Sequence, residues 1–521
     1  MLSSLTKKYR HKIKTAAELK RILGPRPRAK KVIMCHGVFD VVHPGHVRHL
    51  LYAKTKADIL VASLTSDLHI SKGHHRPHIP EQLRALNLAA FEVIDYVIID
   101  KNATPIQNVE LLQPDFFAKG YEYTAAGLPP KTQEEVAVLA SYGGEMIFTP
   151  GDVVYSSTRL IDLAPPSITS EKLLTFMDSE KLTFGKLRRA LARLGKCKVH
   201  VVGDTIVDSY TQTAMIGGQA KTPTMSVLYE RRDDYIGGAA VVAEHLRAAG
   251  AQVVFSTVLG DDRLKDFVLE GLKKSGVDCR AVIDKTRPTT HKNAIVAGGY
   301  RLLKIDTLDN RSISDDIVAR LAAAIRKLPS DAVVFSDFRH GIFNRRTIPP
   351  LVGAIPKGRF KVADSQVASR WGNITEFKGF DLITPNEREA RFALADQDSG
   401  IRPLASALYD AAQCQTLILK LGERGVLTCR SSDHTSVESF VVVDSFVDRV
   451  VDAVGAGDAL LAYATLAKMA TGSDAIATIL GSMAAACECE VDGNIPVTPG
   501  DVGRKIDKLE QQANYSENGK S

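Results

Sequence analysis

Residues 36–50 read HGVFDVVHPGHVRHL and follow the apolar run KKVIMC. The apolar run predicts a strand, and a helix is expected to begin at the segment HPGH. His43 and His46 are three residues apart, which brings two imidazoles onto one face of that helix. Gly45 lets a ligand approach the backbone closely, and a helix N-terminus offers N–H donors to an anion. The segment therefore predicts a phosphate-binding turn between a strand and a helix.

Strand-like and helix-like patterns alternate on both sides of this turn. Such alternation is typical of a parallel sheet with helices on both faces, whose ligands bind at the carboxyl ends of the strands. The strand-like runs of this first half are residues 31–37, 57–67, 95–100 and 144–150, and the helix-like runs include 81–94 and 131–143.

A second segment of the same kind occupies residues 450–464 and reads VVDAVGAGDALLAYA. Its small residues allow successive backbone N–H groups to converge on an anion at a helix start. Asp458 is placed to accept a proton from an attacking hydroxyl, which phosphoryl transfer requires. A simple glycine-rich turn is the alternative. Strand–helix alternation resumes at VHVVGD (199–204) and continues to this segment.

The patterns divide the chain into two doubly wound α/β domains. A proline- and serine-containing stretch without strand pattern separates them. We expect an N-terminal extension (1–30), a Rossmann-like domain (31–163), a linker with a helix (164–195), a second domain with a small β lid (196–508) and a polar tail (509–521).

Composition restricts the class of protein. The chain has 521 residues, a formal net charge of +7 and 45% hydrophobic residues, which is typical of a globular enzyme. The seven cysteines show no metal-ligand spacing and no disulfide framework. No apolar run is long enough to span a membrane, and the basic residues are dispersed rather than clustered for nucleic acid. We therefore expect a cytoplasmic protein that binds neither membrane nor nucleic acid.

The first half resembles the cytidylyltransferase-like nucleotidyltransferases through HPGH and several ordered elements: SKGHHRP, EQLRALNL, LLQPDFFAKG and VYSSTRLI. The resemblance implies attack of a phosphate-bearing substrate on the α-phosphorus of a nucleoside triphosphate, with pyrophosphate leaving. A metal site at His43, His46 and His49 is the alternative. The implied catalytic residues are His43, His46 and Lys72, and the implied nucleotide- and phosphate-binding residues are Gly37, Phe39, Asp40, Gly45, Arg76, Lys119, Gly120, Ser156, Ser157 and Thr158.

The second half resembles the ribokinase-like (phosphofructokinase-B) sugar kinases through GDTIVD, YIGGAAVV, SDF, TPNEREA, LKLGERG and the GAGD of residues 455–458. The resemblance makes Asp458 the catalytic base. It implies nucleotide or phosphate binding by Asn386, Glu389, Lys420, Gly422, Gly425, Gly455, Ala456 and Gly457, with Asn386 and Glu389 holding Mg²⁺ through water. It implies substrate binding by Asp204, Asp208, Gly237, Gly238, Asp337 and Asp452.

Together, the two halves resemble the bifunctional ADP-heptose synthase family in reversed domain order. This implies ATP-dependent phosphorylation of a sugar such as a heptose 7-phosphate. It also implies nucleotidyl transfer, from ATP or CTP, to a sugar 1-phosphate, giving a nucleotide-activated heptose for lipopolysaccharide or another surface glycan. The resemblance also implies Mg²⁺ as the cofactor. A homodimer formed through a lid at residues 210–235 is also expected.

Besides the reversed domain order, the chain departs from this family in two ways that concern the sugar substrate. Val241 replaces an asparagine of the family, and His340 and Gln366 replace lysines. Arg339 or His340 is a candidate to compensate for the missing lysines. The alternatives are a kinase and cytidylyltransferase for another sugar or polyol phosphate, and a regulatory protein with one inactive domain.

Overall fold

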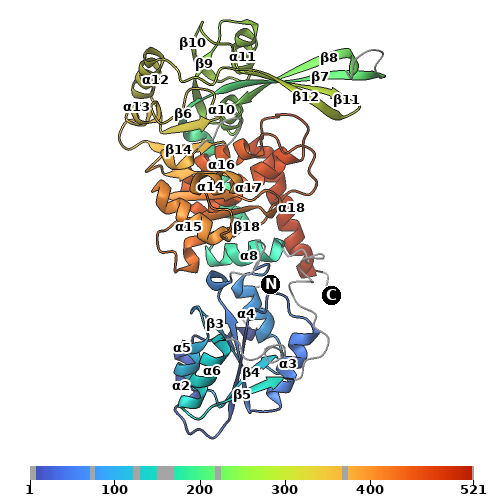
Figure 1. Cartoon of the computed structure of the whole chain (residues 1–521), viewed down its shortest axis with the longest axis vertical. Helices are drawn as coiled ribbons and strands as arrows, with labels where there is room; N and C mark the ends of the chain where they lie inside the picture. The colour runs from blue at the N-terminus through green and yellow to red at the C-terminus, as the bar shows by residue number, and fades with distance from the viewer. Residues whose placement is uncertain are drawn as a thin grey trace. The chain divides into compact units, whose positions relative to one another are not determined.

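The computed structural model describes residues 8–70, 77–120, 130–149, 169–217, 225–366 and 373–518. The chain forms two compact units, one of residues 1–176 with 515–521 and one of residues 177–514 (Figure 1). The division falls inside the stretch that the sequence predicts as a linker. Within the described ranges, no helix has the length and apolar character needed to cross a membrane.

Unit 1 contains a five-stranded, all-parallel sheet of the predicted kind, in the order β3-β2-β1-β4-β5. β1 lies at its centre, so the strand order reverses there, and ligands of such sheets bind at this point. The strands are β1 (Val32–Gly37), β2 (Ile59–Thr65), β3 (Tyr96–Asp100), β4 (Phe116–Gly120) and β5 (Glu145–Thr149).

Helices cover both faces of this sheet because the side chains of β1 alternate between two apolar clusters. Ile33 and Cys35 pack with α3 and α4, whereas Val32 and Met34 pack with α2, α5 and α6. The predicted N-terminal extension therefore belongs to the core, since it contains α2. The helices are α2 (Ala16–Leu23), α3 (Pro44–Lys54), α4 (Glu81–Ala89), α5 (Ile106–Leu112) and α6 (Pro130–Ser141).

Unit 2 is built on a nine-stranded sheet in the order β10-β9-β6-β13-β14-β15-β16-β17-β18. The pairs from β10 to β16 are parallel, but β17 and β18 add antiparallel at the edge, which the sequence did not predict. The strands are β6 (Lys198–Gly203), β9 (Gln252–Leu259), β10 (Asp278–Ile283), β13 (Ala332–Asp337), β14 (Phe360–Ser365), β15 (Leu382–Ile383), β16 (Thr416–Lys420), β17 (Val426–Cys429) and β18 (Phe440–Val443).

Among the helices of unit 2, α16 and α17 are apolar on most sides and are therefore largely buried. α18 continues through the first ten residues of the predicted tail, 509–518. The helices are α8 (Thr169–Ser179, shared with unit 1), α9 (Phe184–Leu191), α10 (Ala239–Ala248), α11 (Arg263–Lys274), α12 (Asp315–Lys327), α13 (Ile348–Val352), α14 (Glu387–Leu394), α15 (Ile401–Ala412), α16 (Ala456–Thr471), α17 (Asp474–Cys489) and α18 (Pro499–Asn518).

A separate four-stranded sheet, in the order β12-β11-β7-β8, forms a lid on unit 2 (Figure 1). The predicted lid segment contributes β7 (Thr205–Gly217) and β8 (Ser226–Gly238), which pair antiparallel. The sequence missed β11 (His291–Ala297) and β12 (Tyr300–Thr307); β11 pairs parallel with β7. The lid therefore presents side chains from four strands rather than two.

Candidate active sites

In unit 1, the turn between β1 and α3 brings His43 and His46 together. Their ring centroids lie 4.0 Å apart. His43 is the N-cap of α3, and its Nδ1 accepts a hydrogen bond from the backbone N–H of Gly45 at 3.1 Å. A Cβ at Gly45 would lie 2.9 Å from Cε1 of His43, so glycine is needed for the imidazole to fold over the helix start.

Burial controls the charge of both imidazoles. It is the main cause that lowers the pKa of His46 to about 4, and the neighbouring His43 and His49 act in the same direction. It also lowers the pKa of His43, and Arg48 adds to this effect. Both rings are therefore neutral at pH 7. His43, whose Nδ1 accepts from Gly45, keeps its Nε2–H for a phosphate oxygen, whereas a backbone hydrogen bond to Val41 engages the N–H of His46.

The side chain of Asp40, a predicted phosphate-binding residue, is hydrogen-bonded within the fold. Its two carboxylate oxygens accept hydrogen bonds from the backbone N–H groups of His78 and Ile79, at 2.9 and 2.8 Å. The side chain is completely buried. Asp40 thus attaches the chain before α4 to the β1–α3 turn, and its predicted contact with nucleotide stays a prediction.

Arg84 on α4 forms hydrogen bonds at the carboxyl ends of β1 and β2. Its guanidinium donates to the carbonyls of Val38 and Thr65 and to the carboxylate of Asp67, the last at 2.5 Å. Arg84 has no exposed surface. This arginine therefore links the ends of β1 and β2 to α4.

Lys119, at the end of β4, forms an ion pair with Glu135 and donates to the hydroxyl of Thr132 at 2.9 Å. Gly120 follows it as the last residue of β4. Gly37 is the last residue of β1 and Phe39 lies in the turn that follows; a Cβ at Gly37 would lie 3.3 Å from the Phe39 ring. Five predicted residues lie outside the described residues: Lys72, Arg76, Ser156, Ser157 and Thr158.

In unit 2, one cavity of about 1330 Å³ brings most of the predicted kinase residues together. The lid closes one side of it and the carboxyl ends of the sheet strands form the other. The predicted residues that line it are Asp208, Gly237, Gly238, Asn386, Glu389, Lys420, Gly422, Gly425, Asp452, Gly455, Ala456, Gly457 and Asp458, and Val241 lines it too.

The start of α16 forms an anion-binding position within this cavity. Gly455 is its N-cap, with φ +83°, and no side chain caps the helix. A Cβ at Gly455 would lie 2.8 Å from Oε1 of the buried Glu488, and one at Gly457 would lie 3.2 Å from Nζ of Lys420. These glycines therefore let the helix start pack against two charged groups and leave its N–H end uncapped by side chains.

Asp458 lies in the first turn of α16 and is 8% exposed. Its pKa is raised to about 7, mainly by burial and also by the neighbouring Asp364, with Lys420 acting in the opposite direction. Lys420 donates to both carboxylate oxygens of Asp364, at 3.2 and 3.1 Å. A carboxylate with a pKa near the working pH is suited to act as a general base.

At the lid end of the cavity, Asp208 and Lys292 are register partners on β7 and β11. A Cβ at Gly237 would lie 2.2 Å from Oδ2 of Asp208, so the glycine makes room for this carboxylate. Burial raises the pKa of Asp208 and lowers that of Lys292. Lys292 of β11, and Arg301 and Lys304 of β12, were not predicted from the sequence because these two strands were not identified. The short apolar run AIVA (294–297) is the signal that indicates β11.

Asp204 and Asp337 do not line the cavity. Asp204 accepts hydrogen bonds from the backbone N–H groups of residues 338, 340 and 342, at 3.1, 3.1 and 3.3 Å. Asp337 accepts from the hydroxyl of Ser365 at 2.7 Å and pairs with Arg339 at 2.8 Å. These two carboxylates hold the loop after β13 in place. A sugar hydroxyl would have to compete with the backbone N–H groups of this loop to bind them.

The two residues considered as replacements for the family's lysines are also engaged elsewhere. Arg339 pairs with Asp337 and, at 2.9 Å, with Glu376. Nδ1 of His340 lies 2.7 Å from Oδ1 of Asn310. Neither residue lines the cavity, whereas Gln366 does. That Arg339 or His340 compensates for the lysines stays a prediction, and the cations that line the cavity lie elsewhere.

Asn386 and Glu389 form a capping box at the start of α14. The side chain of Asn386 accepts from the N–H of Glu389 at 2.8 Å, and Glu389 accepts from the N–H of Asn386 at 2.7 Å. Both residues still line the cavity. In the part of the chain that the structure describes, no three His, Cys, Asp or Glu side chains are grouped to hold a metal ion directly.

Comparisons with known proteins agree with the two units. The family model of the pfkB family carbohydrate kinases matches residues 196–499, and the cytidylyltransferase-like model matches residues 34–162. Bifunctional protein HldE of Bradyrhizobium sp. (strain ORS 278) is 31% identical over 337 residues, which is 62% of this chain and 65% of that protein, hence less than two thirds of its length.

A second relative matches a shorter stretch more closely. Bifunctional protein HldE of Geobacter metallireducens is 39% identical over 154 residues, 29% of this chain and 30% of that protein. Among solved structures, phosphofructokinase-2 from Escherichia coli in complex with potassium has a TM-score of 0.50 at 18% identity, covering 60% of this chain and 99% of that one. This structural likeness concerns the fold.

Proposed function

The chain belongs to the pfkB family of carbohydrate kinases, and from that premise we propose that it is a bifunctional sugar-activating enzyme. Unit 2 phosphorylates a sugar with ATP, and unit 1 transfers a nucleotidyl group to a sugar 1-phosphate. The observation that carries the proposal is the placement of Asp458 at the uncapped start of α16, in one cavity with Asp208.

The kinase step follows from the groups in this cavity. Asp208 accepts hydrogen bonds from sugar hydroxyls, and Asp458 accepts the proton of the attacking hydroxyl as its oxygen bonds to the γ-phosphorus of ATP. The bond from that phosphorus to the bridging oxygen breaks, and ADP leaves. The N–H groups at the start of α16 stabilise the charge that develops on the transferred phosphoryl group.

The predicted Mg²⁺ fits the chemistry of this site. Carboxylate oxygens are the ligands that Mg²⁺ prefers, usually with several retained waters. Glu389 lines the cavity beside Asn386 and Lys420, and Oδ1 of the buried Asp458 has no hydrogen-bond partner among the described residues. When bound, Mg²⁺ neutralises phosphate charge; Asn386 and Glu389 would hold it through water.

In unit 1, His43 donates its N–H to the α-phosphate of a nucleoside triphosphate, ATP or CTP, and His46 lies beside it. A phosphate oxygen of the sugar 1-phosphate attacks the α-phosphorus, and pyrophosphate leaves. Lys119, with Lys72 and Arg76, would neutralise phosphate charge, and residues 156–158 would bind it. Binding through Lys119 requires that its pairing with Glu135 be shared with the nucleotide.

The charge of the lid favours a phosphorylated sugar such as a heptose 7-phosphate. Lys292, Arg301 and Lys304 line the lid end of the cavity. Lys292, although half-buried, forms no ion pair or hydrogen bond among the described residues. These cations supply the positive charge that is lost where His340 and Gln366 stand in place of the family's lysines.

The exposed apolar side chains of the lid support a homodimer formed through it. They include Met215, Leu228, Tyr229, Tyr300 and Leu303, each more than half exposed. Light scattering on the full chain tests this arrangement, and a monomer at micromolar concentration contradicts it. We place the enzyme in the cytoplasm, where ATP is available.

The experiment for the proposed function is a substrate panel. The full chain is incubated with Mg²⁺, ATP or CTP, and sugars, sugar phosphates and sugar 1-phosphates, including heptose forms. ADP, pyrophosphate and the nucleotide-sugar are followed by mass spectrometry. ADP formation and pyrophosphate release, each with its own substrate, support the two activities. Absence of one of them across the panel identifies a protein with one inactive domain.

A further inference from the structure

We propose that Arg388 binds the phosphates of the nucleoside triphosphate at the kinase site, an inference that rests on the proposed kinase function of unit 2. Arg388 is the second residue of α14 and lines the large cavity with Lys420, Gly457 and Asp458. A parallel bridge between Asn386 and Lys420 brings the start of α14 to the end of β16. The arginine therefore lies beside the residues expected to surround the phosphates.

The cavity needs a cation at this end. Its described lining includes the carboxylates of Glu389, Asp452 and Asp458, whereas a triphosphate adds further negative charge. Four lining cations, at residues 231, 292, 301 and 304, belong to the lid; Lys420 and Arg388 lie on the opposite side. Lys420 is held by both oxygens of Asp364, so part of its charge is already compensated.

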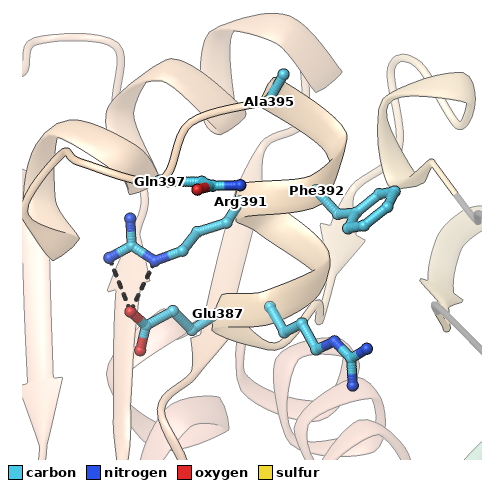
Figure 2. Close-up of a pocket in the computed structure, with 6 residues that line it drawn as sticks. Glu387, Arg391, Phe392, Ala395 and Gln397 are labelled. Carbon is cyan, nitrogen blue, oxygen red and sulfur yellow. Dashed lines mark hydrogen bonds and ion pairs between the residues drawn. The ribbon is translucent and has the colours of Figure 1, made fainter.

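Arg388 differs from its neighbouring arginines in having no such partner. Glu387 uses one carboxylate oxygen for Arg391, at 2.9 and 2.8 Å, and the other for Arg424. Figure 2 shows the first of these pairs as two dashed lines between Arg391 and Glu387, on the side of α14 away from the Phe392 ring. Arg388 is exposed and has no hydrogen bond or ion pair among the described residues.

A guanidinium is suited to this role because it stays charged and can bind two phosphate oxygens at once. Loss of a charge-assisted hydrogen bond predicts that Arg388→Ala weakens the binding of Mg²⁺–AMP-PNP by about 10- to 100-fold. Arg388→Lys should recover part of this loss because the charge is kept but the two-pronged contact is not. KM for ATP rises in parallel, and KM for the sugar stays within about twofold.

The test is calorimetric titration of the full-length protein with Mg²⁺–AMP-PNP and, separately, with adenosine. Arg388→Ala should weaken the binding of the triphosphate analogue and leave the binding of adenosine unchanged. Arg320→Ala, which removes an exposed arginine of α12, serves as the control and should alter neither. Equal affinity of wild type and Arg388→Ala for the analogue, or an equal loss for both ligands, overturns the inference. Because binding is measured without sugar, it stays interpretable even if no sugar in the panel is phosphorylated.

Discussion

Replacing Asp458 by Asn should abolish phosphoryl transfer and at the same time stabilise unit 2. The pKa of Asp458 is raised from 3.8 to about 7, mainly by burial. The folded unit therefore holds a proton that the unfolded chain releases as the pH rises above about 4. Stability then falls with increasing pH until Asp458 ionises in the folded state near pH 7. Asparagine keeps the shape and removes this dependence.

The size of the effect follows from the two pKa values. Each factor of ten is 1.36 kcal/mol, so the difference between 3.8 and about 7 amounts to at most about 4 kcal/mol above pH 7. At pH 5 the same reasoning gives a destabilisation of about 2 kcal/mol from the raised pKa of Asp458. The variant should therefore gain roughly 2 kcal/mol more at pH 8 than at pH 5. Without a general base, kcat should fall by about 100- to 10,000-fold.

Scanning calorimetry at pH 5 and pH 8 measures the first effect, and coupled detection of ADP measures the second. Asp492→Asn is the matched control, because Asp492 lines the same cavity but is exposed and its charge remains hydrated. The reasoning is refuted if Asp458→Asn unfolds at or below the wild-type temperature at pH 8, or if it keeps more than a tenth of the wild-type kcat.

Three further outcomes are expected. The kcat/KM of the kinase reaction should increase with pH through about 7, because Asp458 must lose its proton to act as a base, and a profile that is flat from pH 6 to 8 contradicts this. Gly237→Ala would place a Cβ 2.2 Å from Oδ2 of Asp208, so KM for the sugar should rise about tenfold while Mg²⁺–AMP-PNP binding, measured by calorimetry, stays unchanged. Arg84→Met leaves the buried Asp67 without its ion pair, so chemical denaturation should show unit 1 destabilised by about 3–5 kcal/mol, with an unchanged transition for unit 2.

The fold was predictable from the sequence to the extent that local patterns determine it. Apolar runs such as ILVASLT of β2 are continuous because strands of a doubly wound sheet are buried on both faces. The spacing of His43 and His46 likewise predicts two adjacent rings, and they lie 4.0 Å apart. The GAGD segment predicts a helix start, and α16 begins at Ala456.

What the sequence could not supply depends on long-range contacts. Asp204 and Asp40 occur in motifs expected to bind ligands, but backbone N–H groups from distant loops occupy their carboxylates. Lys292 acquires its place in the cavity only through the parallel pairing of β11 with β7, across some eighty residues. The capping box of Asn386 and Glu389 shows how one motif can serve both a helix end and a ligand site.

The central claim is that each unit carries one independent phosphate-transfer site. It is tested most directly by assaying Asp458→Asn and His46→Ala in the full chain for both products by mass spectrometry. Asp458→Asn should still convert a sugar 1-phosphate to the nucleotide-sugar but form no phosphorylated sugar, and His46→Ala should do the opposite. Loss of both products from either single change would contradict the account.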